Sequence, residues 1–337
     1  MSAPIPLCPL GRRGLVVSRL GLGLAALGRP AYITLGRDRD LPGERTREAM
    51  YAHAAAVLDA AWAAGVRYVD VARSYGDAEV FLARWIAAQA VPPADLTVGS
   101  KWGYRYAADW RMDAPVHEEK EHSLARFTAQ LAESRRLLGP WLDLYQVHSA
   151  TLDSGLLDDP DLLRALVDAR QRGAYRAVGL TLSGPGSAAT LARALEARVD
   201  GEPVFDVVQA TFNCLEPSLA PALAAAHDAG LGVIAKEVFA NGRLTAANTR
   251  PEDRALLERL GALAAARGLG VDQLALAFVL AHPFVDVALS GAATPAQLAS
   301  HAAAATLALD EPTRAALAAL AEPTARYWQT RSTLPWT

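Results

Sequence analysis

Short apolar runs rich in β-branched residues alternate with longer segments of helical periodicity along most of the chain. Eight of these runs are predicted to be strands, at residues 20–24, 67–71, 97–101, 142–148, 177–182, 206–211, 232–236 and 285–290. Since the runs are continuously apolar and helices separate them, the strands are expected to pair in parallel and to be buried on both faces.

Helical patterns fill the intervals between these runs. The clearest patterns cover residues 49–64, 78–89, 124–138, 161–172, 187–197 and 218–229. Several of them end at a glycine just before the next strand, at positions 65, 139, 173 and 230. Eight strands alternating with helices predict an α/β fold, a (β/α)8 TIM barrel that forms a single domain over residues 1–337. A doubly wound sheet would need a phosphate-binding turn, for which the glycines at 21, 23 and 28 are too loosely spaced.

Three further segments are expected to flank the barrel. Residues 10–17, with their Gly-Arg-Arg-Gly turn, are predicted to form a β-hairpin at the barrel floor. The long connections at 28–48, 102–123, 149–160 and 237–251 each follow a strand, so they are expected on the C-terminal face, where barrel active sites are built. The aromatic tail at 322–337 follows the last helix and is expected near the same face.

Composition narrows the class of partner. Hydrophobic residues make up 52% of the chain and the formal net charge is -3, so neither nucleic acid nor an anionic membrane surface is an expected partner. No run reaches the roughly 18 apolar residues of a membrane span, and the first residues lack the apolar core of a signal peptide. Cys8 and Cys214 are the only cysteines, which argues against a disulfide framework. We expect a cytoplasmic protein, a monomer or simple homo-oligomer, that binds a small molecule.

Three charged or titratable residues end successive predicted strands: Asp70, Lys101 and His148. Tyr75 lies a few residues beyond the first of them. Because the carboxyl ends of parallel barrel strands meet at one mouth, these four side chains are expected to converge. Alone, such an Asp is usually a helix cap and such a His a structural residue, but three in successive strands reinforce one another.

The four side chains match the needs of carbonyl reduction, which places a hydride on carbon and a proton on oxygen. A free tyrosine, with a pKa of about 10, is a weak proton donor, but a lysine ammonium roughly 4 Å away contributes about 4 kcal/mol. We therefore expect Tyr75 to be the general acid or base, activated by Lys101, with Asp70 holding that lysine charged. His148 is expected to donate a hydrogen bond to the substrate oxygen and so to polarise the carbonyl.

These residues give the sequence a resemblance to the aldo-keto reductase family over about residues 10–320. The stretch 70–76 looks like the tyrosine motif of that family, and Lys101 and His148 fall where its lysine and histidine are expected. The resemblance implies a (β/α)8 barrel of monomer scale that binds NADP(H) or NAD(H) without a Rossmann domain. It also implies direct hydride transfer between nicotinamide and an aldehyde, ketone or alcohol, with no metal.

The resemblance assigns the nicotinamide half of the cofactor less completely. Gly23 and Asp70 fall at cofactor contacts, and Gln209 matches the glutamine that contacts the carboxamide. Thr181 replaces a family serine, but the following leucine cannot supply the amide of the usual asparagine. Lys236 stands where the family usually has an aromatic residue that stacks on the nicotinamide, and it is interpreted either as an anchor for pyrophosphate or substrate or as the partner of an adjacent carboxylate.

The resemblance also assigns the pyrophosphate and adenosine halves. Gly242 and Arg243 lie in a segment that resembles the loop folding over the pyrophosphate. The adenosine-phosphate segment supplies Gly291, Ala292, Thr294, Gln297 and His301. NADPH-dependent members often carry a lysine and an arginine at positions 291 and 297, and both charges are missing, so the choice between NADPH and NADH stays open.

The long loops bear on the substrate and leave two other functions open. Tyr32, Trp102, Tyr104 and Trp328 are expected to wall the pocket, which suits an apolar or sugar-like carbonyl compound. One alternative is a barrel aldolase or isomerase that uses Lys101 or Lys236 as a Schiff-base nucleophile. The other is an NADP(H)-binding regulatory or redox-sensing subunit.

Overall fold

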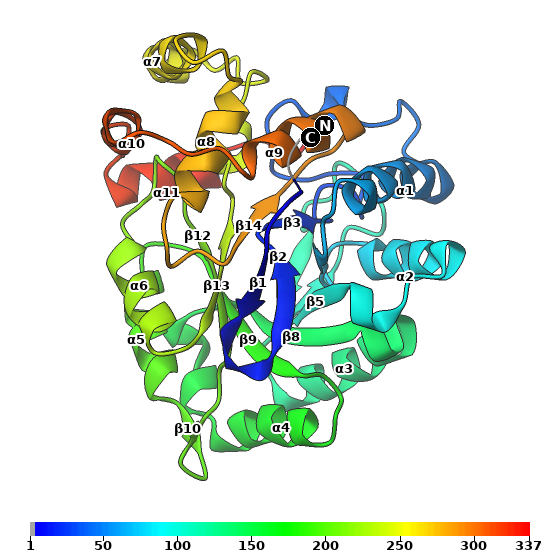
Figure 1. Ribbon diagram of the computed structural model, residues 1–337. Helices are drawn as coiled ribbons and strands as arrows, with labels where there is room; N and C mark the ends of the chain where they lie inside the picture. Colours follow the sequence, from blue (N-terminus) through cyan, green and yellow to red (C-terminus); the bar gives the residue numbers. More distant parts are fainter. Residues whose placement is uncertain (1–3) are drawn as a thin grey trace.

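The computed structural model describes residues 4–337 and contains a closed barrel of eight parallel strands (Figure 1). In chain order the barrel strands are β3 (Leu20–Gly23), β4 (Tyr68–Asp70), β5 (Thr97–Trp102), β8 (Leu142–Ala150), β9 (Ala177–Leu182), β12 (Val207–Thr211), β13 (Gly232–Lys236) and β14 (Val287–Ser290). β14 pairs with β3 and closes the barrel. All eight predicted strands are confirmed, with ends that differ by two residues or fewer.

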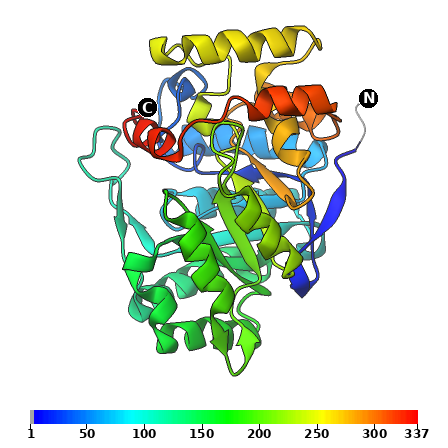
Figure 2. The same cartoon turned by 90° about the vertical axis from the view of Figure 1, so that its left-hand side faces the viewer.

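Helices surround the strands on the outside (Figure 2). They are α1 (Arg47–Ala63), α2 (Ala78–Gln89), α3 (Leu124–Leu138), α4 (Pro160–Gln171), α5 (Ser187–Glu196), α6 (Ala220–Asp228), α7 (Arg254–Ala265), α8 (Val271–Leu280), α9 (Pro295–Ala304), α10 (Glu311–Ala318) and α11 (Thr324–Ser332). Side-chain caps begin several of them. Thr46 accepts a hydrogen bond from the Ala49 amide at α1, and Ser123 accepts one from Arg126 at α3. The six predicted helices are confirmed, and the bounds of α2 and α3 match the prediction.

The Tyr68 side chain lies in the barrel interior, packed against two glycines of the neighbouring strands. A Cβ at Gly21 would come within 2.7 Å of the Tyr68 ring, and a Cβ at Gly99 would collide with its hydroxyl group. These glycines in the neighbouring strands β3 and β5 therefore leave room for the tyrosine, and they bring its hydroxyl beneath the carboxyl ends of the strands.

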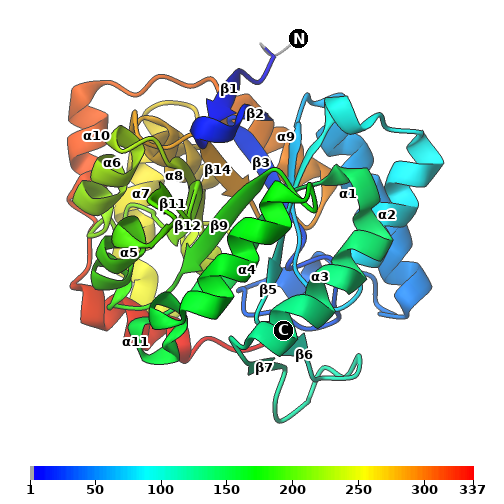
Figure 3. The same ribbon diagram turned by 90° about the horizontal axis from the view of Figure 1, so that it is seen from below.

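A hairpin of β1 (Leu7–Leu10) and β2 (Leu15–Ser18) lies at the foot of the barrel, and Figure 3 shows this end of the molecule. It extends beyond the predicted 10–17, because the pairing continues to Ser18 opposite Leu7. Leu10, Leu15 and Val17 are buried against the amino ends of the strands. The hairpin thus seals the floor with apolar side chains.

The opposite, C-terminal face carries the long connections. One of them contains a second hairpin, β6 (Tyr104–Tyr106) with β7 (Glu118–Lys120). A short pair, β10 (Arg198–Val199) with β11 (Glu202–Pro203), instead connects α5 to the amino end of β12, on the floor side. Beyond α11 the chain runs back to the loop after β3, where Tyr32 and Thr337 exchange two backbone hydrogen bonds of 3.1 and 3.0 Å. Figure 3 shows this end of the chain beside β6 and β7. Among residues 4–337, no helix combines the length and apolar character needed to cross a membrane.

Candidate active site

Asp70 and Lys101 form a buried ion pair at the carboxyl ends of β4 and β5. The Lys101 ammonium donates to the Asp70 carboxylate and, at 3.0 Å, to the carbonyl oxygen of Val71. Its Nζ also lies 4.7 Å from the centroid of the Tyr75 ring. The ion pair with Asp70 of the neighbouring strand therefore holds the Lys101 side chain next to the Tyr75 ring, which follows β4.

The Asp70 carboxylate is the centre of a polar network inside the barrel mouth. Besides Lys101, it accepts hydrogen bonds from Tyr68 Oη at 3.2 Å, Gln146 Nε2 at 3.3 Å and Gln209 Nε2 at 2.8 Å. All of these side chains are buried. A buried carboxylate is tolerated only when it is paired and hydrogen-bonded, and this network supplies those partners to Asp70 and keeps the lysine in place.

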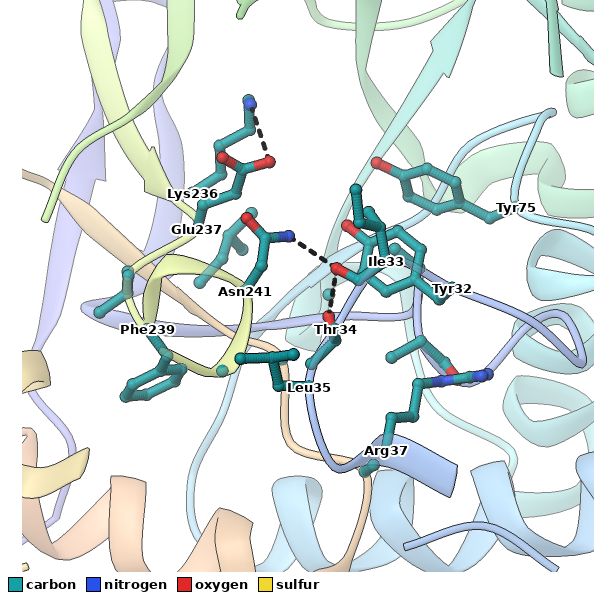
Figure 4. Close-up of a pocket in the computed structure, with 18 of the residues that line it drawn as sticks. Tyr32, Ile33, Thr34, Leu35, Arg37, Tyr75, Lys236, Glu237, Phe239 and Asn241 are labelled. Atoms are coloured by element: carbon teal, nitrogen blue, oxygen red, sulfur yellow. Dashed lines mark hydrogen bonds and ion pairs between the residues drawn. The ribbon is translucent and has the colours of Figure 1, made fainter. Parts of the chain in front are cut away.

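Tyr75 directs its hydroxyl group into a cavity (Figure 4). The residue is 9% exposed, and no side-chain hydrogen bond to its hydroxyl is found in the described part of the chain. Burial raises the pKa of Tyr75 well above its usual 10, and the charges of Asp70 and Glu118 raise it further. Without a ligand, the phenol is therefore protonated and free to donate.

His148 faces Tyr75 across the barrel mouth. The two rings meet edge to face with their centroids 5.5 Å apart, and the Tyr104 ring lies 4.9 Å from the imidazole. Burial lowers the pKa of His148 well below 6.5, and the nearby cations Lys101 and Lys236 lower it further. A neutral imidazole carries one N–H, so His148 can donate one hydrogen bond into the cavity while its Nδ1 lies 3.4 Å from Ser74 Oγ.

One cavity of about 720 Å³ extends over this face. At one end it is lined by Tyr75 and His148, and at the other by Gly291 and His301. The segments at 33–35 and 239–242 cover its middle, where Asn241 donates to the carbonyl oxygen of Ile33 at 2.9 Å (Figure 4). A long, partly covered cavity of this kind suits an extended ligand.

Twelve of the predicted site residues line this cavity. They are Gly23, Tyr32, Asp70, Tyr75, Tyr104, His148, Gln209, Lys236, Gly242, Gly291, Gln297 and His301. Lys101 lies directly behind Asp70 and Tyr75 rather than at the cavity surface. Of the predicted sets, the four proposed catalytic side chains are thus brought together, and most cofactor positions share their cavity.

Two predicted substrate residues lie elsewhere. Trp102 is fully buried and packs against Phe127 at 5.1 Å and His122 at 5.8 Å, because successive residues of a strand point to opposite faces and Lys101 takes the inner one. Trp328 packs against Tyr327 on α11. The tail reaches the cavity instead through Trp336, which stacks on His117 at 4.1 Å.

Four predicted cofactor residues make other contacts. Arg243 is held by Asp253 at 2.7 Å and Glu322 at 2.7 Å, so its charge is already paired within the protein. Thr181 accepts from the Ser149 amide at 2.7 Å, and Thr294 caps α9 by accepting from Gln297. Ala292 is buried, with its amide donating to Ser290 Oγ at 3.1 Å. None of these four residues lines the cavity.

Lys236 lies within a polar cluster on the cavity wall. Its ammonium donates to Ser183 at 2.8 Å and Thr211 at 2.9 Å, and it lies 3.8 Å from the Glu237 carboxylate. Burial lowers the pKa of Lys236 to about 8. The Glu237 carboxylate is paired with Arg331 at 2.9 Å, and although burial opposes ionisation, the two cations hold its pKa at about 2.

Sequence reasoning missed several residues of this cavity. The family pattern predicts that Thr181 supplies a hydroxyl group to the cavity, but the hydroxyl group that lines it belongs to Ser183, directly after Leu182. Arg29, Asp40, Glu118 and Trp336 also line the cavity, and each lies in a loop, an edge hairpin or the tail, where no hydrophobic period marks the inward positions.

The comparisons with known proteins agree with this architecture. The aldo/keto reductase family model matches residues 19–322, so the chain belongs to that family. A 6-dehydroglucose reductase from Novosphingobium aromaticivorans is 27% identical over 268 residues, which cover 75% of this chain and 80% of that protein. A D-threo-aldose 1-dehydrogenase from a Pseudomonas species is 26% identical over 318 residues, which cover 86% of this chain and 89% of that protein.

Among solved structures, the fold matches that of an aldo-keto reductase from Bacillus halodurans in its holo form. The TM-score is 0.70 at 21% sequence identity, and the match covers 94% of this chain and 97% of the other. Family membership makes the chain an oxidoreductase that uses a nicotinamide cofactor and acts on a small-molecule carbonyl or alcohol. Family membership therefore supports the oxidoreductase function over the Schiff-base aldolase or isomerase.

The cavity residues fit a nicotinamide dinucleotide. Asn241 Oδ1 is buried and has no hydrogen-bond donor within residues 4–337, although its amide nitrogen is bonded. Gln209 uses its nitrogen on Asp70, which leaves its oxygen for a donor in the cavity. At Gly291 a Cβ would meet no atom within 4 Å, so the backbone is open to a ligand. Hydrogen-bond acceptors and space for a ligand are therefore available in the cavity.

Proposed function

We propose that this protein is an NAD(H)-dependent oxidoreductase that interconverts a sugar-like carbonyl compound and its alcohol. The observation that carries the proposal is the Lys101 ammonium, which is bonded to Asp70 and lies 4.7 Å from the Tyr75 ring centroid. A cation in this position stabilises the phenolate, and the proton of Tyr75 can then move to or from a substrate oxygen in the cavity.

Each of the four side chains has a separate task in this mechanism. Tyr75 donates its proton to the carbonyl oxygen during reduction and takes it back during oxidation. His148, kept neutral by burial, donates its N–H to the same oxygen as negative charge develops there. Lys101 stabilises the Tyr75 phenolate, and Asp70 keeps Lys101 charged and oriented. The bound nicotinamide supplies or accepts the hydride.

The protein would hold the cofactor with residues along the cavity. Gln209 and Asn241 would use their amide oxygens to accept hydrogen bonds from the carboxamide or hydroxyl groups of the cofactor, and Gly291 would let the backbone approach the adenosine half. The covering segments at 33–35 and 239–242 would exclude water from the middle of the cofactor.

The substrate class follows from the relatives and from the polar lining near Tyr75. The names of both relatives refer to aldoses or a glucose derivative. Glu118, Lys120 and Thr151 line the cavity together with the aromatic rings of Tyr104 and Trp336. Hydroxyl groups need such donors and acceptors, whereas the rings suit the apolar face of a sugar.

The preference for NAD(H) follows from the charges at the adenosine end. Gln297 donates to Asp40 at 2.7 Å, and the Asp272 carboxylate lies 3.6 Å from His301. Arg243 is committed to two carboxylates, and Arg37 donates to the backbone carbonyl oxygens of Pro30 and Thr337. A 2'-phosphate carries close to two negative charges, so the Asp40 and Asp272 carboxylates would repel it, while Arg37 and Arg243 are already bonded within the protein.

We propose that the protein is cytoplasmic. Cys8 and Cys214 are both free thiols, which suits a reducing cytoplasm. The barrel buries its own core, so we propose a monomer or a simple homo-oligomer.

The first test removes the proposed proton donor. We expect Tyr75→Phe to lose about two to four orders of magnitude in kcat for aldose oxidation and aldehyde reduction, since general acid–base catalysis contributes about that much. Cofactor absorbance measures turnover, and nicotinamide fluorescence measures NADH binding, which should stay near wild type. Tyr51→Phe on α1 is the matched control.

Two results would contradict this assignment of roles. Wild-type turnover in Tyr75→Phe would exclude Tyr75 as the donor. Tight NADH binding without turnover on any carbonyl or alcohol would instead favour a redox-sensing subunit.

The second test concerns the adenosine end. We expect NADH to bind at least about tenfold more tightly than NADPH, because an unpaired phosphate beside a carboxylate costs more than about 1.4 kcal/mol. Asp40→Asn should reduce the ratio of the two affinities by weakening the repulsion of NADPH. Asp38→Asn, two residues earlier in the chain, should leave this ratio unchanged. Fluorescence titration of both cofactors measures the ratio, and equal affinities in the wild-type protein would refute the preference.

A further inference from the structure

Arg29 lies buried among three aromatic rings at the cavity wall. It is 1% exposed, and its guanidinium carbon lies 4.9 Å from the ring centroid of Tyr32, 5.2 Å from that of Tyr75 and 5.2 Å from that of Trp336. The three rings come from the loop after β3, the loop after β4 and the tail. A single cation therefore contacts the proposed proton donor and two segments that cover the cavity.

The hydrogen bonds of Arg29 fix it against the backbone that carries Tyr75. Its Nη1 donates to Glu118 Oε1 at 2.9 Å and to the carbonyl oxygen of Ser74 at 3.1 Å, and its Nε donates to Ala25 at 3.3 Å. Ser74 immediately precedes Tyr75. An arginine that is buried and bonded in this way orients its neighbours, because moving it would leave a charge without a partner.

The turn after Tyr75 packs on the same arginine. Gly76 has a φ of +60°, and a Cβ there would come within 2.9 Å of the Arg29 Cβ. The Asp77 amide donates to the carbonyl oxygen of Gly28 at 2.8 Å. The stretch from Ser74 to Asp77 is thus held to the Gly28–Arg29 backbone on both sides of the tyrosine.

The electrostatic surroundings of Tyr75 are mixed. The titratable and charged groups that face it from the packed elements are Arg29, Tyr32, Tyr68, Asp70, Lys101, Glu118, His148 and Glu237. Glu118 opposes ionisation of the phenol, whereas Arg29 favours it. Since Arg29 and Glu118 are themselves paired, removing either one leaves the other uncompensated beside the tyrosine.

We propose that Arg29 is a positioning residue of the oxidoreductase site, which orients Tyr75, stabilises its phenolate against Glu118 and seats the tail through Trp336. The inference rests on the proposed function, because it assumes that Tyr75 exchanges the proton. It goes beyond that function by assigning a second cation, besides Lys101, to the surroundings of Tyr75. Arg29 links this tyrosine to the β6–β7 hairpin and to the tail.

The test compares Arg29→Met with Arg29→Lys in the full chain. Alcohol oxidation by NAD+ speeds up as Tyr75 loses its proton, so the pH–rate profile reports on the phenolate. We expect Arg29→Met to move this profile to higher pH by about one unit, which lowers kcat about tenfold on its rising part. Arg29→Lys keeps the charge and should restore most of the shift. Arg84→Met is the matched control, because Arg84 pairs with Glu48 and covers the Tyr51 ring far from the cavity.

A second variant keeps the proposal testable if Arg29→Met does not fold. Glu118→Gln removes the opposing carboxylate, so its profile should move to lower pH. The ultraviolet difference absorbance between each variant and the same variant with Tyr75→Phe should show the same displacements without cofactor or substrate.

The outcomes separate this inference from the proposed function. Equal loss of kcat at every pH in Arg29→Met, with the profile in place, would show a purely structural role and overturn the inference, and an unmoved profile in Glu118→Gln would do the same. Full activity in Tyr75→Phe would instead overturn the proposed function. A shift in Arg29→Met that Arg29→Lys reverses would support the inference.

Discussion

At the scale of single residues, the site depends on how buried charges are paired. The Asp70 carboxylate accepts from four side chains, and the Lys101 ammonium is held between that carboxylate and the Val71 carbonyl oxygen. Lys236 differs, because its nearest carboxylate lies 3.8 Å away and is shared with Arg331. Lys101 therefore has a carboxylate partner in direct contact, whereas burial disfavours the charged form of Lys236.

This difference predicts a pH-dependent effect on stability. Burial lowers the pKa of Lys236 from 10.5 to about 8, so between these values the unfolded chain binds more protons and the free energy of unfolding rises with pH. At about pH 7 the full cost applies, and we expect Lys236→Met to be more stable than wild type by about 2 to 3 kcal/mol. Urea unfolding at several pH values should show the difference shrinking as pH rises through this window. A difference that stays constant with pH would contradict the prediction.

At the scale of elements, the loops after β3 and β13, the two strands that flank β14, are joined over the cavity. The Leu35 amide donates to the Asn241 carbonyl oxygen at 3.0 Å, and the Asn241 side chain donates to Ile33 at 2.9 Å. The loop after β13 contains left-handed residues, including Ala240 with φ 47° and Asn241 with φ 54°. Such conformations persist only where surrounding contacts hold them, and here the loop after β3 supplies those contacts.

The side-chain bond of Asn241 can be tested apart from its backbone conformation. Asn241→Gly accepts the left-handed φ but loses the amide group, so we expect about fivefold weaker NADH binding and faster release, since one hydrogen bond contributes about 1 kcal/mol. Stopped-flow fluorescence measures both rates. Ala240→Gly relieves the same kind of strain without touching the loop contact and should bind NADH as wild type does. An unchanged rate of NADH release in Asn241→Gly would show that the bond between the Asn241 side chain and Ile33 does not retain the cofactor.

At the scale of the whole molecule, Arg37 joins the first long loop to the tail. Its guanidinium group is buried and donates to the carbonyl oxygens of Ala26 at 2.7 Å, Pro30 at 3.1 Å, Arg29 at 2.5 Å and Thr337 at 2.8 Å. Burial lowers its pKa from 12.5 to about 9. One side chain thus satisfies several backbone acceptors around the cavity and connects residues 300 positions apart.

Removing this connection should destabilise the molecule as a whole. We expect Arg37→Met to lower the free energy of unfolding by about 3 kcal/mol, because several buried carbonyl oxygens lose their donor. Arg39→Met, in the same short helix η2 (Arg37–Arg39), removes an exposed arginine and should change stability by less than about 0.5 kcal/mol. Chemical denaturation compares the two variants. Equal stability of both would mean that water replaces the guanidinium group.

Much of the fold and the proposed catalytic set could be predicted because each depends on local pattern. Strand and helix positions follow from hydrophobic period, and the carboxyl ends of parallel strands meet wherever eight of them close. Asp70, Lys101 and His148 could therefore be brought together without a structure. The inward or outward direction of Trp102 also follows from the alternation after Lys101, although its aromatic character suggested a pocket wall.

The sequence alone thus predicted the barrel, its strands, the proposed proton donor and the three side chains around it. Only the tertiary structure decided which charges are free. In the folded molecule Arg243 is paired with Asp253 and Glu322, and Gln297 donates to Asp40. Trp336, and not Trp328, lines the cavity. The reason is that loops and tails have no repeating pattern, and their ion pairs form between segments far apart in the chain, so their partners depend on distances that only the folded barrel sets.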